Sequence, residues 1–154
     1  MEIEKKYLIR DLPENWEQYE SDELEQCYLC TDPTIRIRRK NDSYILTYKR
    51  RVEPEGGEQK LCVSDEREAP LTERAYCHLR EKADGRVIKK TRVRIPYQGH
   101  VIELDIFHGE YEGMYLAEVE FGSEQESADF IPPAWFGEDV SGDYHYTNSY
   151  LSSK

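Results

Sequence analysis

The feature that most limits what this chain can fold into is a set of short segments in which charge of one sign recurs at every second residue. Alternate side chains of a β-strand point to the same face, so each segment would carry a row of like charges on one face and apolar residues on the other. The acidic rows are Glu66/Glu68, Glu103/Asp105 and Glu118/Glu120, and the basic rows are Arg36/Arg38 and Lys90/Arg92. The first segment, residues 1–10, carries both signs on one face, through Glu2, Glu4 and Lys6.

Such rows are unfavourable on a sheet with one solvated face, because like charges two residues apart repel each other unless opposite charge lies between them. If the sheet rolls into a barrel with these rows inward, acidic and basic rows meet across a lumen. Burying unpaired charge is costly, so the lumen must hold water and a strongly charged ligand. The pattern therefore predicts a barrel with a charged interior.

Alternation and turn residues predict the remaining elements. Strands are expected at residues 1–10, 27–30, 34–40, 44–50, 61–68, 86–95, 100–107 and 115–121, with a loop over 52–59. Asp11 before Pro13 predicts a short helix. Thr72 caps a second helix that Gly85 ends, a capping box of Ser123 and Glu126 begins a third, and residues 148–151 form a short helix at one tunnel mouth. The fold class is mainly β (α+β), with about eight antiparallel strands and a few helices, in one domain over 1–154.

Composition narrows the classes of partner. The net charge of −11 argues against nonspecific binding to nucleic acid or to an anionic membrane. The N-terminus has no apolar signal region and no apolar run reaches membrane-spanning length, so we expect a cytoplasmic protein. Four cysteines, including a Cys27-x-x-Cys30 pair without a matching second pair, do not suggest a disulfide scaffold or a zinc site.

The two signs of charge suit the two parts of one ligand. Arginine can bind two phosphate oxygens at once, so the basic residues favour a run of phosphates. Clustered carboxylates favour a hard divalent cation, Mg²⁺ or Mn²⁺, that takes oxygen ligands and also binds substrate phosphates. A metal with a polyphosphate accounts for both.

The sequence Glu2-x-Glu4-x-Lys6 resembles the signature of the CYTH superfamily, the triphosphate tunnel metalloenzymes. Further matching motifs follow in order along nearly the whole chain: residues 28–29, 35–38, 46–49, 66–68, 90–92, 103–107, 117–120 and 133–137. The resemblance implies a closed eight-stranded antiparallel tunnel that binds a triphosphate with Mg²⁺ or Mn²⁺. It is similar to the small bacterial inorganic triphosphatases in particular.

The resemblance also implies residue roles. Phosphates would be bound by Lys6, Arg36, Arg38, Lys49, Lys90 and Arg92. Metal would be bound by Glu2 and Glu4 with Glu118 or Glu120, and a second metal by Glu103 and Asp105. Catalysis would use Glu4 and a working pair of Tyr28 and Lys90, with Glu66 and Glu68 as further tunnel carboxylates. Ser64 stands where relatives often have a basic residue, which would remove one phosphate contact.

The expected reaction is metal-dependent hydrolysis of inorganic tripolyphosphate to pyrophosphate and phosphate. An adenylate cyclase or a thiamine triphosphatase of the same fold is the first alternative, and a noncatalytic module that binds polyphosphate or nucleotide is the second. The absence of a long insertion to hold a nucleobase or thiazole favours the inorganic substrate. The expected partner is thus a small-molecule triphosphate, bound by a monomer or a homodimer.

Overall fold

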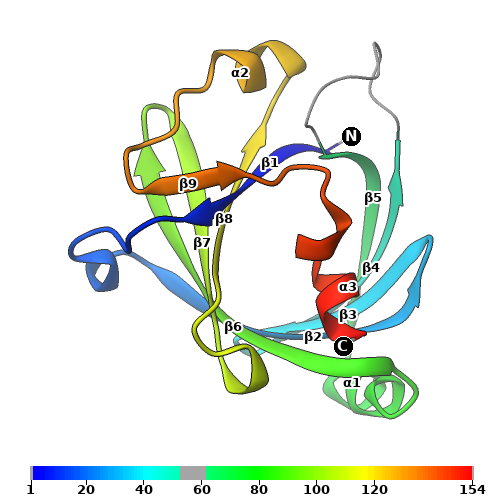
Figure 1. Ribbon diagram of the computed structural model, residues 1–154. Coiled ribbons are helices and arrows are strands. Elements are labelled where there is room, and N and C mark those ends of the chain that lie inside the picture. The colour runs from blue at the N-terminus through cyan, green and yellow to red at the C-terminus, as the bar shows by residue number, and fades with distance from the viewer. Residues whose placement is uncertain (1, 53–61, 154) are drawn as a thin grey trace.

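The strands close into an antiparallel barrel in the computed structural model, which describes residues 2–52 and 62–153 (Figure 1). Neighbouring strands follow the order β5-β4-β3-β2-β6-β7-β8-β1, and pairing of β1 with β5 completes the ring. The bounds are β1 Glu2–Ile9, β2 Ser21–Thr31, β3 Thr34–Lys40, β4 Ser43–Arg51, β5 Cys62–Leu71, β6 Asp84–Tyr97, β7 His100–Phe107, β8 Tyr115–Phe121 and β9 Phe136–Asp139. The predicted closed eight-stranded barrel is confirmed, with β9 as an additional strand on β1.

β1 is the strand at which the ring closes. One of its edges pairs with β8 from Ile3 to Leu8. The other edge is divided, because Glu2–Glu4 pair with β5 and Tyr7 and Ile9 pair with β9. Closure therefore brings the acidic start of β1 beside β5, where Glu2 pairs with Ser64.

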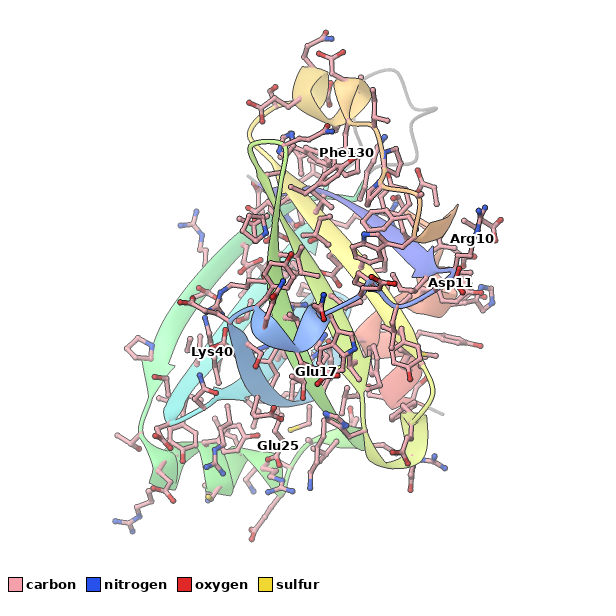
Figure 2. All side chains as sticks on the ribbon, turned by 90° about the vertical axis from the view of Figure 1, so that its left-hand side faces the viewer. Arg10, Asp11, Glu17, Glu25, Lys40 and Phe130 are labelled. Atoms are coloured by element: carbon pink, nitrogen blue, oxygen red, sulfur yellow. The ribbon has the colours of Figure 1, made fainter. Side chains whose placement is uncertain are left out.

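The apolar faces of the strands point outward and are covered by the helices and connecting segments. Around β1, β6, β7 and β8 they form one core cluster with Phe130 and Phe136, against which Leu12 and Trp16 also pack. Phe130 lies below α2 (Glu124–Asp129) in Figure 2, and its ring contacts those of Tyr97, His100 and Phe121. A second cluster forms where Tyr76 of α1 (Glu73–Arg80) packs on Cys27 and Ile37. Burial of the outer faces leaves the charged faces for the lumen.

At one end of the barrel the inward-facing rows become apolar. Each of three apolar residues lies two positions from a charged one on its strand and so points inward with it: Ile88 with Lys90, Phe107 with Asp105, and Leu116 with Glu118. These apolar residues form a buried cluster with Leu151 of the C-terminal segment. This segment contains η3 (Tyr144–Tyr146) and α3 (Asn148–Ser152) and lies inside the ring of strands (Figure 1). The predicted C-terminal helix is thus present, and an apolar floor closes the barrel at its end.

The local differences from the sequence predictions have simple causes. The helix expected after Asp11 is wrong: Asn15 adopts a left-handed conformation and only the 3₁₀ turn η1 (Trp16–Gln18) follows. Thr72 caps α1 as predicted, accepting a hydrogen bond from Ala75 N (3.1 Å), but α1 ends at Arg80, well before Gly85. Ser123 caps α2 and accepts from Glu126 N, whereas the Glu126 carboxylate accepts from Gly122 N rather than from Ser123 N.

The strand expected at 27–30 is part of the longer strand β2. The 3₁₀ turn η2 (Gly109–Tyr111) has no counterpart among the predicted elements. Most of the loop predicted over 52–59 lies outside the described residues. Among the described residues, no helix combines the length and the apolar character needed to cross a membrane.

Candidate active site

A cavity of about 210 Å³ lies inside the barrel, between the apolar floor and the end at which β1 meets β5. Its walls are mainly charged side chains from seven strands, because the inward faces of those strands carry the alternating rows. The lining residues are Glu2, Glu4, Lys6, Tyr28, Thr34, Arg36, Arg38, Lys49, Arg51, Val63, Ser64, Glu66, Arg92, Glu103, Glu118, Glu120, Thr147 and Asn148. Acidic and basic rows therefore do meet across a lumen.

Carboxylates from neighbouring strands crowd one part of this wall. Lys49 Nζ lies between two of them, 2.7 Å from Glu2 Oε1 and 3.6 Å from Glu4 Oε1. Burial raises the pKa of Glu4, and the charges of Glu118 and Glu2 raise it further, against the opposing effect of Lys49. Burial and neighbouring carboxylates likewise raise the pKa of Glu120. These groups are a site at which additional positive charge would be stabilising.

Glu118 is a cavity carboxylate with two cations close to it. Its oxygens lie 3.4 Å from Lys6 Nζ and 3.5 Å from Arg92 Nη2. Burial alone would raise its pKa, but Lys6 and Arg92 outweigh that effect and hold the pKa well below its usual value. Glu118 is therefore ionised and already neutralised by protein cations.

The opposite part of the wall has cations with neutral partners. Arg36 Nη2 donates to Thr47 Oγ1 (3.2 Å), and Arg38 Nε donates to Gln26 Oε1 (2.9 Å). Within residues 2–52 and 62–153, neither guanidinium has a carboxylate at ion-pairing distance, and Arg36 Nε is buried without a hydrogen-bond partner. Burial and the neighbouring guanidinium groups of Arg36 and Arg92 lower the pKa of Arg38 to about 9. An anion in the cavity would relieve both effects.

Toward the closed end of the barrel, on β6 and β7, lies a buried ion network centred on Asp105. Its Oδ2 accepts from Lys90 Nζ (2.7 Å) and from Arg92 Nη2 (2.9 Å), while Oδ1 accepts from Arg92 Nε (2.7 Å). Asp105 is 1% exposed and Lys90 is fully buried. Burial lowers the pKa of Lys90 to about 8 even though Asp105 opposes that effect. The bidentate contact fixes the guanidinium plane of Arg92 at the cavity surface.

The structure brings most of the sequence-predicted residues to the cavity, but not all of them. Glu68 is exposed near the end of β5, where Oε2 lies 3.4 Å from Thr47 Oγ1, and it does not line the cavity. Lys90 and Asp105 lie deeper, toward the closed end, and do not line the cavity, and cations contact both oxygens of Asp105. The hydroxyl of Tyr28 accepts from Gln26 Nε2 (3.2 Å), and the Lys90 ammonium contacts Asp105 and Asn148, so the two do not meet directly among the described residues.

Several residues that line or support the cavity were not singled out from the sequence. Arg51 continues the alternation of Lys49 by one more step, so the pattern could have identified it. Thr47 and Gln26 stand opposite Arg36 and Arg38 in the strand register and serve as their neutral hydrogen-bond partners. Thr147 and Asn148 carry no such signal, because their position depends on how the C-terminal segment docks inside the barrel.

The donor set fits a divalent cation in chemistry, although the side chains are paired with ammonium groups as they stand. Among the described residues, no group of three Asp, Glu, His or Cys side chains is arranged to hold an ion. The reason is that Lys49 lies between Glu2 and Glu4 and Lys6 lies against Glu118. A hard cation that replaced the Lys49 ammonium would meet only carboxylate oxygens and water, its preferred ligands.

Comparisons with known proteins agree with this geometry. No protein-family model matches the chain. An inorganic triphosphatase from Nitrosomonas europaea is 36% identical over 157 residues, covering 98% of this chain and 96% of the relative. One from Acetivibrio thermocellus is 37% identical over 120 residues, covering 78% and 72%. The crystal structure of an inorganic triphosphatase superposes with a TM-score of 0.71 at 33% identity, covering 100% of this chain and 95% of that one. With the charged tunnel and the near-complete alignment, the chain belongs to the inorganic triphosphatase family of the CYTH superfamily, the triphosphate tunnel metalloenzymes.

Proposed function

We propose that this protein hydrolyses inorganic tripolyphosphate to pyrophosphate and phosphate with Mg²⁺ or Mn²⁺ in the tunnel. The observation that carries the proposal is the division of one cavity into two walls. Arg36 and Arg38 face it with neutral partners only, while Glu2, Glu4 and Glu120 crowd the other wall. An anion with several phosphates suits the first wall, and a divalent cation suits the second.

Glu2 and Glu4, with Glu120, are the residues that we propose to hold the metal. Glu118 and Glu103 complete the acidic surroundings, and Lys49 would move from the carboxylates toward a phosphate. When bound, such a metal neutralises charge on the phosphate oxygens and can activate a water. We assign Asp105 a different role from the predicted second-metal ligand, because its oxygens already position Arg92 and Lys90.

The residues of this chain would act mainly by positioning and by neutralising charge, which is what phosphoryl transfer requires. Arg36, Arg38 and Arg92 would orient the phosphates, with Lys6 and Lys49 at either side. A water oxygen then bonds to phosphorus while the bond from that phosphorus to the bridging oxygen breaks. Tyr28 lines the cavity, where its hydroxyl oxygen accepts a hydrogen bond from Gln26 Nε2, and its own O–H would donate to a phosphate oxygen. The proton released by the water passes to the products or to solvent.

The size of the cavity favours an inorganic substrate. At about 210 Å³ it is smaller than the roughly 300–1,000 Å³ typical of pockets that hold organic ligands. A thiamine or adenosine group would therefore have to remain outside it. The same comparison argues against the adenylate cyclase alternative, because a cyclase must enclose the ribose hydroxyl near the metal.

The direct test is to incubate the purified protein with tripolyphosphate, ATP or thiamine triphosphate in parallel, with Mg²⁺ or Mn²⁺, and to measure phosphate release. We expect the highest kcat/KM with tripolyphosphate, complete loss of turnover with excess EDTA, and recovery when either metal is restored. Formation of cyclic AMP, or faster cleavage of thiamine triphosphate, would show that an alternative activity is correct. Binding of tripolyphosphate without turnover would identify a noncatalytic module.

Replacing Arg38 by Ala is expected to reduce kcat/KM for tripolyphosphate by about a hundredfold, since a charge-assisted bidentate contact contributes about 3 kcal/mol. Arg39 is the matched control: it is next in sequence, points to the exposed outer face and donates to Asn41 O. Arg39→Ala should change kcat/KM less than twofold. Equal effects of the two substitutions on steady-state kinetics would contradict the assignment of Arg38 to the tunnel wall.

A further inference from the structure

The C-terminal segment reaches the two lysines at the deep end of the cavity. Lys6 Nζ donates to the Tyr146 carbonyl (3.0 Å), and Lys90 Nζ lies 3.3 Å from Asn148 Oδ1. Thr147 and Asn148 line the cavity between these contacts. The turn from Tyr146 to Asn148 thus forms the inner end of the charged tunnel, directly against cations that a phosphate would approach.

This turn is held firmly by the part of α3 that follows it. Leu151 is buried against Ile88, Phe107 and Leu116, and its carbonyl accepts a 2.5 Å hydrogen bond from the Tyr111 hydroxyl. On β6, Gly85 has a φ of +69°, and a Cβ built there would stand 2.2 Å from the Ser152 carbonyl oxygen. The backbone of α3 therefore approaches β6 so closely that no side chain fits between them.

A floor at this position limits how far a phosphate chain can enter. The apolar side chains below the turn offer no partner for phosphate oxygens, so a charged group would not pass them. The opposite end of the cavity is lined mainly by polar and charged side chains, Glu2, Ser64, Glu66 and Glu120, with Val63 beside them. A chain that enters there stops with its terminal phosphate against the turn.

We propose that the Tyr146–Asn148 turn sets the binding register: it seats the terminal phosphate, so that cleavage occurs at a fixed number of phosphates from the chain end. This inference rests on the proposed triphosphatase function. It adds a role for the Tyr146–Asn148 turn, which contacts the site but is not part of any barrel strand. In any register the chemical step is the same. Water adds its oxygen to phosphorus, the bond to the bridging oxygen breaks, and the proton released by the water passes to the products or solvent.

Tetrapolyphosphate is the shortest linear polyphosphate that reveals the register. Cleavage of a terminal bond gives phosphate and tripolyphosphate, whereas cleavage of the central bond gives two pyrophosphates. Tripolyphosphate gives the same products from either of its bonds. With Mg²⁺ present, and products separated by ion-exchange chromatography during the initial phase, the unmodified protein should yield one of the two product sets almost exclusively.

Gly85→Ala should displace α3 without changing any residue that lines the cavity. We expect the ratio of the minor to the major product set to rise about tenfold, the effect of losing one hydrogen bond to a charged group. Gly99→Ala is the control, because Gly99 has a similar φ of +79° with nothing within 4 Å of the added Cβ. It should leave the product ratio unchanged. Tyr111→Phe loosens the same helix without backbone strain and should shift the ratio in the same direction by a smaller factor.

Four results would overturn the register proposal. Two concern the unmodified protein: a mixture of both product sets, or no cleavage of tetrapolyphosphate although tripolyphosphate is cleaved. The third is an unchanged product ratio in Tyr111→Phe together with either an unchanged ratio or loss of folding in Gly85→Ala. The fourth is a shift in Gly99→Ala equal to that in Gly85→Ala. Absence of turnover with tripolyphosphate would instead reject the proposed function itself. The two failures are therefore distinguishable.

Discussion

Asp105→Asn is expected to lower the free energy of unfolding by about 3–5 kcal/mol, because it leaves the Lys90 ammonium and the Arg92 guanidinium without their shared buried counter-charge. For a chain of this length that loss corresponds to a fall in the melting temperature of roughly 10 °C. The substitution conserves shape, so the effect reports charge rather than a cavity. Thermal unfolding followed by circular dichroism measures it.

Asp65→Asn is the matched control for this prediction. Asp65 also pairs with an arginine on a neighbouring strand, Arg50, but both side chains are largely exposed. An exposed ion pair contributes about 0–1 kcal/mol, so the melting temperature should fall by no more than roughly 3 °C. Similar shifts for the two substitutions would contradict the description of Asp105 as the centre of a buried network.

A second substitution separates the buried charge from the packing of the network. Lys90→Met replaces the ammonium by an apolar group of similar length, so in the Asp105→Asn background it removes one of the two unpaired cations. We expect the double variant to be more stable than Asp105→Asn alone. A double variant whose loss equals the sum of the single losses would show that the two residues do not interact.

The alternation of charge was sufficient to predict the barrel, because a period of two assigns every strand residue to one of two faces. Glu103 and Leu104 illustrate this: the first lines the cavity and the second is buried outside the ring. Alternation shows which face a residue is on, but not how close it lies to the closed end of the barrel. Glu103 and Asp105 have the same parity, but only Glu103 reaches the cavity, because Arg92 and Lys90 engage Asp105 near the closed end.

The apolar floor is a second feature that the alternation pattern could not predict. Phe107 and Leu116 continue the inward rows of β7 and β8 as apolar residues, and nothing in the local pattern indicates what covers them. The answer depends on Leu151 and on the close approach of Gly85 to Ser152, residues that are far apart in the chain. Long-range docking of this kind has no periodic signal, which is why a terminal helix was predictable but its contacts with Lys6 and Lys90 were not.

Glu4→Gln is expected to reduce kcat/KM for tripolyphosphate by about a thousandfold, because the amide lacks the negative charge with which, in the proposed assignment, Glu4 would bind the metal. The amide keeps the shape of the side chain, and Lys49 retains its 2.7 Å contact with Glu2, so folding should be little affected. Mn²⁺ titration followed by calorimetry should show weakened metal binding in the same variant.

Glu68→Gln is the control that distinguishes a tunnel carboxylate from one that shares only its parity. From the sequence, both residues are expected in the tunnel, Glu4 as a metal ligand and Glu68 as a further tunnel carboxylate. In the structure Glu4 lines the cavity, whereas Glu68 is exposed and does not line it. Glu68→Gln should therefore leave kcat/KM and Mn²⁺ affinity within twofold of the unmodified values. If the two variants lost activity equally, depth in the tunnel would not decide function, and the metal would have to be sought farther along β5. If only Glu4→Gln lost both activity and Mn²⁺ affinity, the acidic start of β1 would be the metal-binding part of the tunnel.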